Sequence, residues 1–331
     1  MPEYPQIDNA GGLWKLPEIA NYKFGGYWPD VGSRGVFAGG RTPSESNVID
    51  FIEIASTGNA TDFGDLQSTK YNMGTGSNGT RGVFFGGYDN YPTQTNVIDT
   101  ITIDTAGNAA DFGNLTVARG STTGHSNSTR AVASGGGDSS VGHSNVIDFF
   151  FMASTGNAFD FGDLTQALGQ GGSVNNSVRG IHAGGIIATN NNQNTINFFE
   201  IATTGNAVDF GDLLADANYI CGCSSSTRGV FSGGQSPANT NVRQFITIAT
   251  QGNAIDFGDT TAVSSRNAST SNSVRGIFAP GENPVSNNII EHFTIASAGN
   301  GIDFGDLSVG RPNLRATSDS HGGLTDGYNR E

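Results

Sequence analysis

The stretch GNATDFGDL at residues 58–66 occurs six times in this chain with small changes. The other copies begin at Gly107, Gly156, Gly205, Gly252 and Gly299. Each copy follows an arginine that opens a short apolar stretch, and consecutive arginines lie 47 or 49 residues apart: Arg34, Arg81, Arg130, Arg179, Arg228 and Arg275. Six units of about 48 residues therefore account for nearly everything after residue 33.

Each unit contains four short apolar patches separated by turn signals, which predict four strands. In the second unit we expect these strands at residues 71–76, 81–85, 96–103 and 111–113. Four-stranded units of this length are typical of propeller blades, in which each small sheet buries both faces against its neighbours around a ring. The 49 glycines and the low content of charged residues, 14%, agree with short strands and many turns. We therefore predict an all-β fold, a six-bladed β-propeller with four antiparallel strands per blade over residues 31–323.

The spacing within the units locates the variable loops and the closure of the ring. The distance from each repeated asparagine, such as Asn59, to the next arginine is always 22 residues, whereas the distance from that arginine to the following asparagine is 25 or 27. The loops between the second and third strands therefore absorb the variation in length, on one face of the ring. Residues 312–323 match a first strand with no second strand after it, so we expect them to complete blade one. Residues 1–30 and 324–331 are then an N-terminal extension and a C-terminal tail.

The charge of the chain argues against nucleic acid as a partner, because a net charge of −14 repels a phosphate backbone. The N-terminus has no basic start followed by an apolar run, and nowhere do 18 apolar residues occur together. We therefore expect neither an export signal nor membrane insertion. The two cysteines, Cys221 and Cys223, are too close for an ordinary disulfide and too few for a zinc site.

A catalytic site needs one asymmetric constellation, so the informative positions are those where the repeat is broken. His182 replaces a phenylalanine of other units, and we interpret it as a packed, hydrogen-bonded residue. The other histidines occur at unrelated repeat positions, without the spacing of a triad or a metal site. Acidic pairs such as Asp62 and Asp65 could bind calcium, although Asp also caps turns readily. The repeated phenylalanines, such as Phe63, are interpreted as packing residues, and we expect no enzyme activity, no cofactor and no metal site.

Two regions of the sequence are candidates for binding. The loops between second and third strands are mostly polar and divergent, and the residues that stand out in them are Tyr88, Asn90, Tyr91, Asn190, Asn191 and Asn192. Tyr and Asn side chains offer stacking and adaptable hydrogen bonds at low entropic cost. Residues 1–30 hold both tryptophans of the chain, Trp14 and Trp28, a residue type enriched in interface hot spots. This segment either packs on the propeller or attaches it to another protein.

The units resemble the kelch repeat. Gly-Gly closes the second strand in all but the last unit, and an aromatic residue is followed after two residues by Leu, as in Phe63 and Leu66. A basic residue comes four positions later in three units, as Lys70, Arg119 and Arg311. Three features depart from the kelch pattern: Phe stands in place of its tryptophan, the turn before that residue is longer, and the fifth unit has Thr260 in place of the Leu. The resemblance implies a propeller.

The chain also resembles virion proteins of marine bacteriophages, especially phages that infect cyanobacteria. The resemblance rests on the repeats, for example residues 126–130 with 145–149 and 156–164, and on the short elements Leu13-Trp14 and Tyr27-Trp28-Pro29. It implies a non-catalytic particle component, such as a fibre, knob or capsid decoration, located in the virion after assembly in the bacterial cytoplasm. Residues 1–30 would then bind other virion proteins, and the propeller could contact a host-surface glycan or receptor.

A propeller lectin, or an enzyme of the galactose oxidase type, is the alternative. This alternative predicts a polar and aromatic cluster at one mouth of the ring. The oxidase also needs copper held by His and Tyr, and no comparable set is evident in the sequence.

Overall fold

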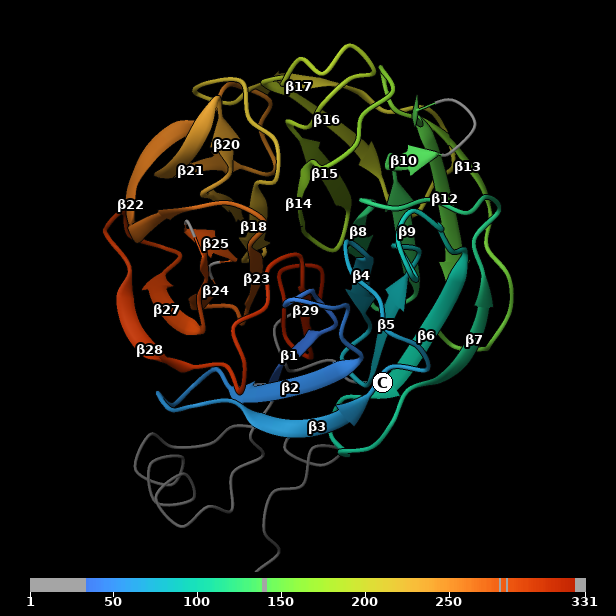
Figure 1. Ribbon diagram of the computed structural model, residues 1–331. Helices are drawn as coiled ribbons and strands as arrows, with labels where there is room; N and C mark the ends of the chain where they lie inside the picture. The colour runs from blue at the N-terminus through green and yellow to red at the C-terminus, as the bar shows by residue number, and fades with distance from the viewer. Residues whose placement is uncertain (1–33, 139–141, 280, 284, 325–331) are drawn as a thin grey trace, which may run out of the picture.

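The computed structural model describes residues 34–138, 142–279, 281–283 and 285–324 (Figure 1). Six antiparallel sheets stand around a central axis, so the predicted six-bladed β-propeller is confirmed. The expected extension at residues 1–30, with Trp14 and Trp28, lies outside the described residues, as does the tail 324–331 apart from Leu324.

Each blade runs from an inner strand beside the axis to an outer strand at the rim. Blade 1 contains, in this order, β29 (Arg315–Ser318), β1 (Arg34–Ala38), β2 (Val48–Glu53) and β3 (Thr61–Asp65); blade 2 contains β4 (Gly74–Ser77), β5 (Arg81–Phe85), β6 (Val97–Thr102) and β7 (Ala110–Asn114); blade 3 contains β8 (Thr123–Ser126), β9 (Arg130–Ser134), β12 (Val146–Phe151) and β13 (Phe159–Asp163). Blade 4 contains β14 (Gly172–Asn175), β15 (Arg179–Ala183), β16 (Thr195–Glu200) and β17 (Val208–Asp212); blade 5 contains β18 (Cys221–Ser224), β19 (Arg228–Ser232), β21 (Ala238–Thr247) and β22 (Ile255–Ser264); blade 6 contains β23 (Ala268–Ser271), β24 (Arg275–Ala279), β27 (Ile289–Thr294) and β28 (Ile302–Asp306). Short strands occupy three of the loops between second and third strands: β10 (Gly137–Asp138) with β11 (Gly142–His143), β20 (Gln235–Ser236) with β21, and β25 (Glu282–Asn283) with β26 (Val285–Ser286).

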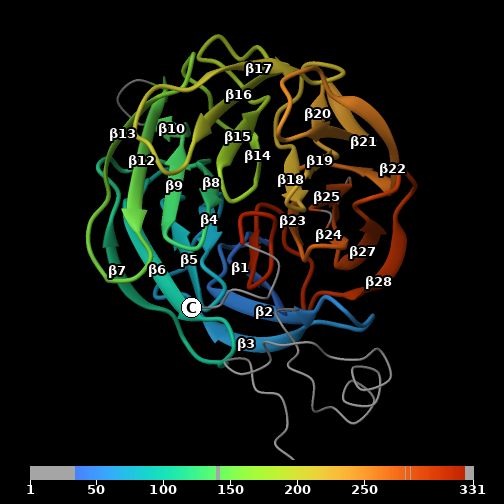
Figure 2. The same cartoon turned by 180° about the vertical axis from the view of Figure 1, so that it is seen from behind.

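The C-terminal strand closes the ring. β29 pairs antiparallel with β1, from Gly35 opposite Ser318 to Ala38 opposite Arg315. The inner strands of neighbouring blades contact one another around the whole axis, including β29 with β4 and with β23. Figure 2 shows the same closed ring from the other face. The expected completion of blade 1 by residues 312–323 is therefore confirmed.

The first strand of blade 2 begins later than the sequence predicts. The prediction starts at Tyr71, whereas β4 starts at Gly74. Asn72 has a positive φ of 54°, which is incompatible with an extended strand, and Tyr71 pairs with Tyr88 through an isolated bridge. The other predicted strands of this blade agree with the structure to within one residue at each end.

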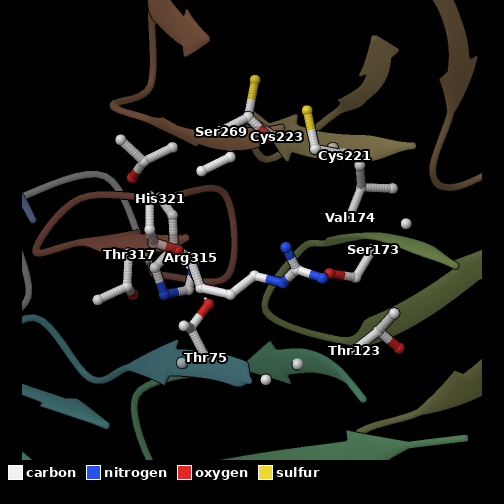
Figure 3. Close-up of a pocket in the computed structure, with 18 of the residues that line it drawn as sticks. Thr75, Thr123, Ser173, Val174, Cys221, Cys223, Ser269, Arg315, Thr317 and His321 are labelled. Carbon is white, nitrogen blue, oxygen red and sulfur yellow. Dashed lines mark hydrogen bonds between the residues drawn. The ribbon is translucent and has the colours of Figure 1, made fainter. Parts of the chain in front are cut away.

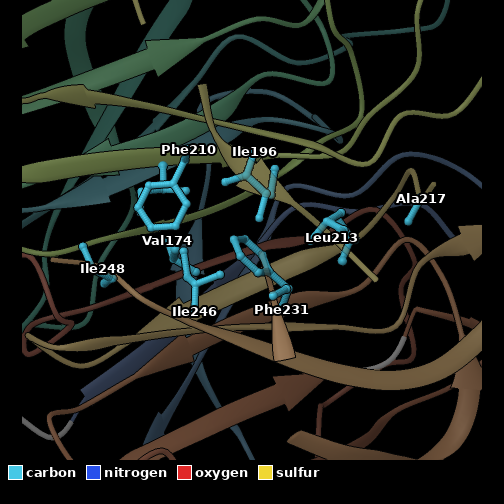
Figure 4. Close-up of a cluster of buried hydrophobic side chains, with 12 residues drawn as sticks. Val174, Ile196, Phe210, Leu213, Ala217, Phe231, Ile246 and Ile248 are labelled. Atoms are coloured by element: carbon cyan, nitrogen blue, oxygen red, sulfur yellow. The ribbon is translucent and has the colours of Figure 1, made fainter. Parts of the chain in front are cut away.

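The hydrophobic core consists of the interfaces between blades. Six buried clusters are present among the described residues, and each one joins side chains of two adjacent blades. In the cluster of Figure 4, Phe210 and Ile196 of blade 4 meet Phe231 and Ile246 of blade 5. The repeated phenylalanine occurs once in each cluster, at 2–3% exposure, as Phe63, Phe112, Phe161, Phe210, Phe257 and Phe304. The interpretation of these residues as packing residues is confirmed.

The repeated stretch also forms the outer hydrogen bonds between blades. Between blades 2 and 3, the Gly156 amide donates to the Phe112 carbonyl at 2.8 Å, and the Asn157 side-chain oxygen accepts from the Asn114 amide at 3.1 Å. The equivalent asparagine makes this bond at all six interfaces, and Asn59 closes the ring with Asp306. The repeated arginines act in the same way, since each donates to a backbone carbonyl of the next blade.

Buried ion pairs explain the basic residue of the kelch-like pattern. Third-strand carboxylates pair with this residue at 2.6–2.8 Å, as Asp50 with Arg311, Asp99 with Lys70 and Asp148 with Arg119. Glu291 of blade 6 pairs at 2.7 Å with a cation from another position, Arg243 on β21. Blades 4 and 5 lack both charges at these positions: Leu168 and Ala217 replace the cation, and Asn197 and Gln244 replace the carboxylate. A blade interface therefore has both a buried cation and a buried carboxylate or neither of them. This agrees with the high free-energy cost of a buried ion without a partner.

The second glycine of the repeated stretch, the one that follows the phenylalanine, is required because the next blade approaches it closely. Gly113 has a φ of 151°, and a Cβ there would overlap the carbonyl oxygen of Gly156. We expect Gly113→Ala to lower the free energy of unfolding by about 2 kcal/mol or more, measured by chemical denaturation. Gly156→Ala is the matched control: its Cβ would meet open space, so the change should stay within about 1 kcal/mol. Equal effects of the two variants would contradict this account.

Two variants test the buried pair of blade 3 against the natural pattern of blade 4. Arg119→Leu leaves Asp148 buried without its cation and should lower the free energy of unfolding by about 3–5 kcal/mol. Adding Asp148→Asn reproduces Leu168 with Asn197, and Thr116, like Thr165 in blade 4, remains as the hydroxyl partner. Denaturation should show that the double variant recovers most of the loss. A double variant no more stable than Arg119→Leu would show that ion pairing does not govern this position.

Candidate functional site

Six residues in the left-handed backbone conformation surround one mouth of the propeller. They occupy the same position in each unit, just before the inner strand, with φ between 50° and 63°: Asn72, Ser121, Gln170, Tyr219, Arg266 and Asn313. None is a glycine, although a positive φ is uncommon for other residues. We call this set the crown.

Hydrogen bonds between blades hold the crown in place. The amide of each of five crown residues donates to the carbonyl of the preceding one, for example Ser121 to Asn72 at 2.8 Å and Tyr219 to Gln170 at 2.7 Å. Asn72 donates to Asn313 at 3.0 Å, so these bonds cross the closure of the ring. The backbone of the crown is thus uniform while its side chains differ from blade to blade.

The crown side chains line a hollow of about 620 Å³, together with residues of three loops. This volume is typical of a small-molecule site. Aromatic and charged residues contribute to the lining: Tyr71, Tyr88, Tyr91, Tyr219, Arg41, Arg266 and Glu282. The hollow therefore combines flat apolar surfaces with hydrogen-bonding groups. We call it the mouth hollow.

Three tyrosines form a row along one side of the mouth hollow. The Tyr71 and Tyr88 rings stack with centroids 5.2 Å apart, and Tyr91 follows Tyr88 at 5.6 Å. Tyr91 is 62% exposed, so the end of the row is open to a ligand. Burial raises the pKa of Tyr71 to about 12, and its hydroxyl stays protonated at neutral pH.

Two arginines face aromatic rings in the mouth hollow. The Arg266 guanidinium lies 4.7 Å from the Tyr219 ring centroid and forms an ion pair with Glu282. The Arg41 guanidinium lies 5.8 Å from the Tyr71 ring centroid and makes no ion pair within the described part of the chain. Stacked guanidinium groups keep their in-plane N–H donors available for a polar ligand.

A neighbouring blade positions the loop that carries Tyr91. The Glu45 carboxylate, from the blade 1 loop, accepts hydrogen bonds from the backbone amides of Asn90 at 2.6 Å and Tyr91 at 2.8 Å. Of the loop residues singled out in the sequence, Tyr88 and Tyr91 line the mouth hollow, and Asn90 supports it through its backbone.

The asparagines of the blade 4 loop are separate from the mouth hollow. Asn190 and Asn191 are exposed, and the Asn192 amide donates to the Gln235 carbonyl at 3.0 Å. None of the three is among the residues that line the hollow. Their role in binding stays a prediction.

Of the residues that line the mouth hollow, only Tyr88 and Tyr91 are among the binding candidates predicted from the sequence, which do not include the aromatic and basic residues Tyr71, Tyr219, Arg41 and Arg266. The crown residues had a detectable signal, because their identities differ between units while the positions around them repeat. Which of these residues face one another depends on the arrangement of the blades around the axis, which the repeat alone does not show.

Buried histidines lie in blades 3 and 4 and form one hydrogen-bond network. The Ser134 hydroxyl contacts His125 Nε2 at 2.9 Å and His182 Nδ1 at 3.0 Å. Burial lowers the pKa of His125 to about 3 and that of His182 to about 4, so both rings are neutral at pH 7. Ser134 is fully buried and therefore inaccessible to a substrate. His182 is packed and hydrogen-bonded, in agreement with its interpretation from the sequence.

The central channel contains the two cysteines (Figure 3). Both are buried and free of a disulfide, and burial raises the pKa of each thiol to about 12. Thiols in this state are poor nucleophiles and poor metal ligands at neutral pH. Across the described ranges, no three His, Cys, Asp or Glu side chains gather closely enough to hold a metal ion.

Comparison with protein-family models and with curated proteins gave no match. In the described part of the chain, no helix has the length and apolar character needed to cross a membrane. These comparisons assign no family to the chain.

Proposed function

We propose that this protein is a non-catalytic binding component of a bacteriophage particle, and that its mouth hollow contacts a host-surface saccharide. The observation that carries the proposal is the row of three tyrosine rings in contact beside arginines in the mouth hollow, on a backbone that hydrogen bonds between the blades hold in place. Aromatic faces suit the apolar faces of sugar rings, and the Arg, Asn and Gln side chains supply directed hydrogen bonds.

The mouth hollow favours binding over oxidase chemistry. A polar and aromatic cluster at one mouth is what a propeller lectin or a galactose-oxidase-like enzyme would require. The described lining residues include four tyrosines but no histidine, whereas a copper site of that type needs both. The proposal therefore combines two hypotheses: saccharide binding, as in a propeller lectin, and a place in a phage particle, as the resemblance of the repeats implies.

The place in the particle rests on the resemblance of the repeats to marine phage virion proteins. Residues 1–30 would attach the propeller to another virion protein, with Trp14 and Trp28 as anchors. The closed ring supports this division of roles, because β29 completes blade 1 from the other end of the chain.

A glycan array tests the saccharide proposal. The wild-type propeller should bind a restricted set of glycans, and Tyr88→Ala with Tyr91→Ala should weaken binding at least tenfold, about 1.4 kcal/mol, because the stacking surface is removed. Asn190→Ala with Asn191→Ala is the matched control on loop residues outside the hollow and should bind as the wild type does. No glycan bound by the wild type, or equal loss in the control, would count against the mouth hollow as the site.

Deletion of residues 1–30 tests attachment. The shortened chain should remain a folded propeller with unchanged glycan binding but should be absent from purified particles, measured by mass spectrometry. Full-length chain with Asn190→Ala serves as the control for incorporation. Trp14→Ala and Trp28→Ala variants that still enter particles at the wild-type level would rule out the tryptophan anchors.

A further inference from the structure

The closing strand brings one long side chain into the central channel. At the first position of the inner strands, five blades carry small residues: Gly74, Thr123, Gly172, Cys221 and Ala268. β29 has Arg315 at this position. Its side chain extends into a channel cavity of about 80 Å³, and its guanidinium points toward the side where β14 carries Ser173 (Figure 3).

Arg315 differs from the buried cations between the blades in having no carboxylate partner within the described ranges. Lys70, Arg119, Arg243 and Arg311 each pair with an acid at 2.6–2.8 Å. Among the described residues, Arg315 instead donates to two neutral acceptors, the Leu314 carbonyl at 3.0 Å and the Asn72 side-chain oxygen at 3.4 Å. A guanidinium has five N–H donors, so these contacts leave donors for a ligand.

The other titratable groups that line the channel cavity are neutral near pH 7. Burial raises the pKa of the Cys221 and Cys223 thiols to about 12 and lowers that of His321 to about 4. Burial also lowers the pKa of Arg315, to about 10, which still leaves it protonated. The channel therefore holds a positive charge that no ionised residue of the described lining balances.

Another polar group that lines the cavity, the Thr270 hydroxyl, lacks a hydrogen-bond partner among the described residues. Thr270 lines the channel at 4% exposure, and its hydroxyl forms no hydrogen bond there. Buried hydroxyl groups are ordinarily hydrogen-bonded. This donor and the guanidinium together indicate that the cavity accommodates a further acceptor.

We propose that the central channel binds a small inorganic anion of chloride size beside the guanidinium of Arg315. The cavity has room for a monatomic ion and accompanying water, but it is too small for an oligosaccharide or a nucleotide. Asn72 contacts Arg315 and also lines the mouth hollow, so the anion site lies next to the mouth hollow, in the channel. Because the anion neutralises a charge between the inner strands, its binding stabilises the closed ring.

Thermal unfolding of the full chain tests this site, with sodium chloride compared against sodium gluconate at equal ionic strength. The wild-type Tm should rise with chloride to saturation, and it should rise less with gluconate, which is too large for the cavity. Arg315→Met should abolish the difference between the two salts. Arg41→Met removes the same charge from the exposed rim of the hollow and should retain the difference. Equal Tm values in the two salts for the wild type, or a retained difference in Arg315→Met, would overturn the proposal.

A second measurement does not depend on any variant folding. Crystals of the wild-type protein grown in sodium bromide should show an anomalous diffraction peak in the channel beside the Arg315 guanidinium. A channel without that peak overturns the proposal. Glycan binding is measured separately, so failure of the anion site leaves the saccharide proposal to its own test.

Discussion

The contact between adjacent blades is the constraint on which the rest of this structure depends. A four-stranded blade is too small to be stable alone, and its apolar faces are buried only by its neighbours. The residues that repeat in the sequence are accordingly those that meet the next blade: Phe112 packs in the interface, Asn157 accepts a backbone amide, and Gly113 admits the facing carbonyl. The sequence therefore repeats because the same interface between adjacent blades occurs six times around the ring.

Because the interfaces carry the stability, one face of the ring is free to vary. The crown shows this division directly, since its backbone bonds continue from blade to blade while its side chains include Ser, Gln, Tyr and Arg. Strain at a positive φ is held by the surrounding ring, which is the usual condition for such residues at functional sites. A rigid frame with varied side chains suits recognition, because little order has to be created when a ligand binds.

The sequence was sufficient for the parts of the fold that repeat. The constant distance of 22 residues and the unpaired segment at 312–323 predicted the number of blades and their closure. The predicted strand start at Tyr71 is wrong because an apolar residue beside a strand has the same sequence pattern as one inside it, and only the backbone shows the left-handed residue Asn72 between Tyr71 and β4. Of the residues in the mouth hollow, Tyr88 and Tyr91 stand out in the sequence by residue type, whereas Tyr219 and Arg266 join them only through the circular order of the blades. The repeat aligns Arg315 with five small residues of the other first strands, but only the structure shows that this position faces the central channel.

The closure of blade 1 has a consequence for synthesis on the ribosome. β1 emerges among the first described elements, whereas its partner β29 follows after about 280 residues, on the order of tens of seconds at ordinary rates of translation. During that interval the inner edge of β1 exposes unpaired backbone groups. Every other blade brings its own inner strand, so this one edge is where two nascent chains on the same messenger could exchange strands. Correct folding of this protein therefore depends on β29 of the same chain reaching the inner edge of β1 before a strand of another chain does.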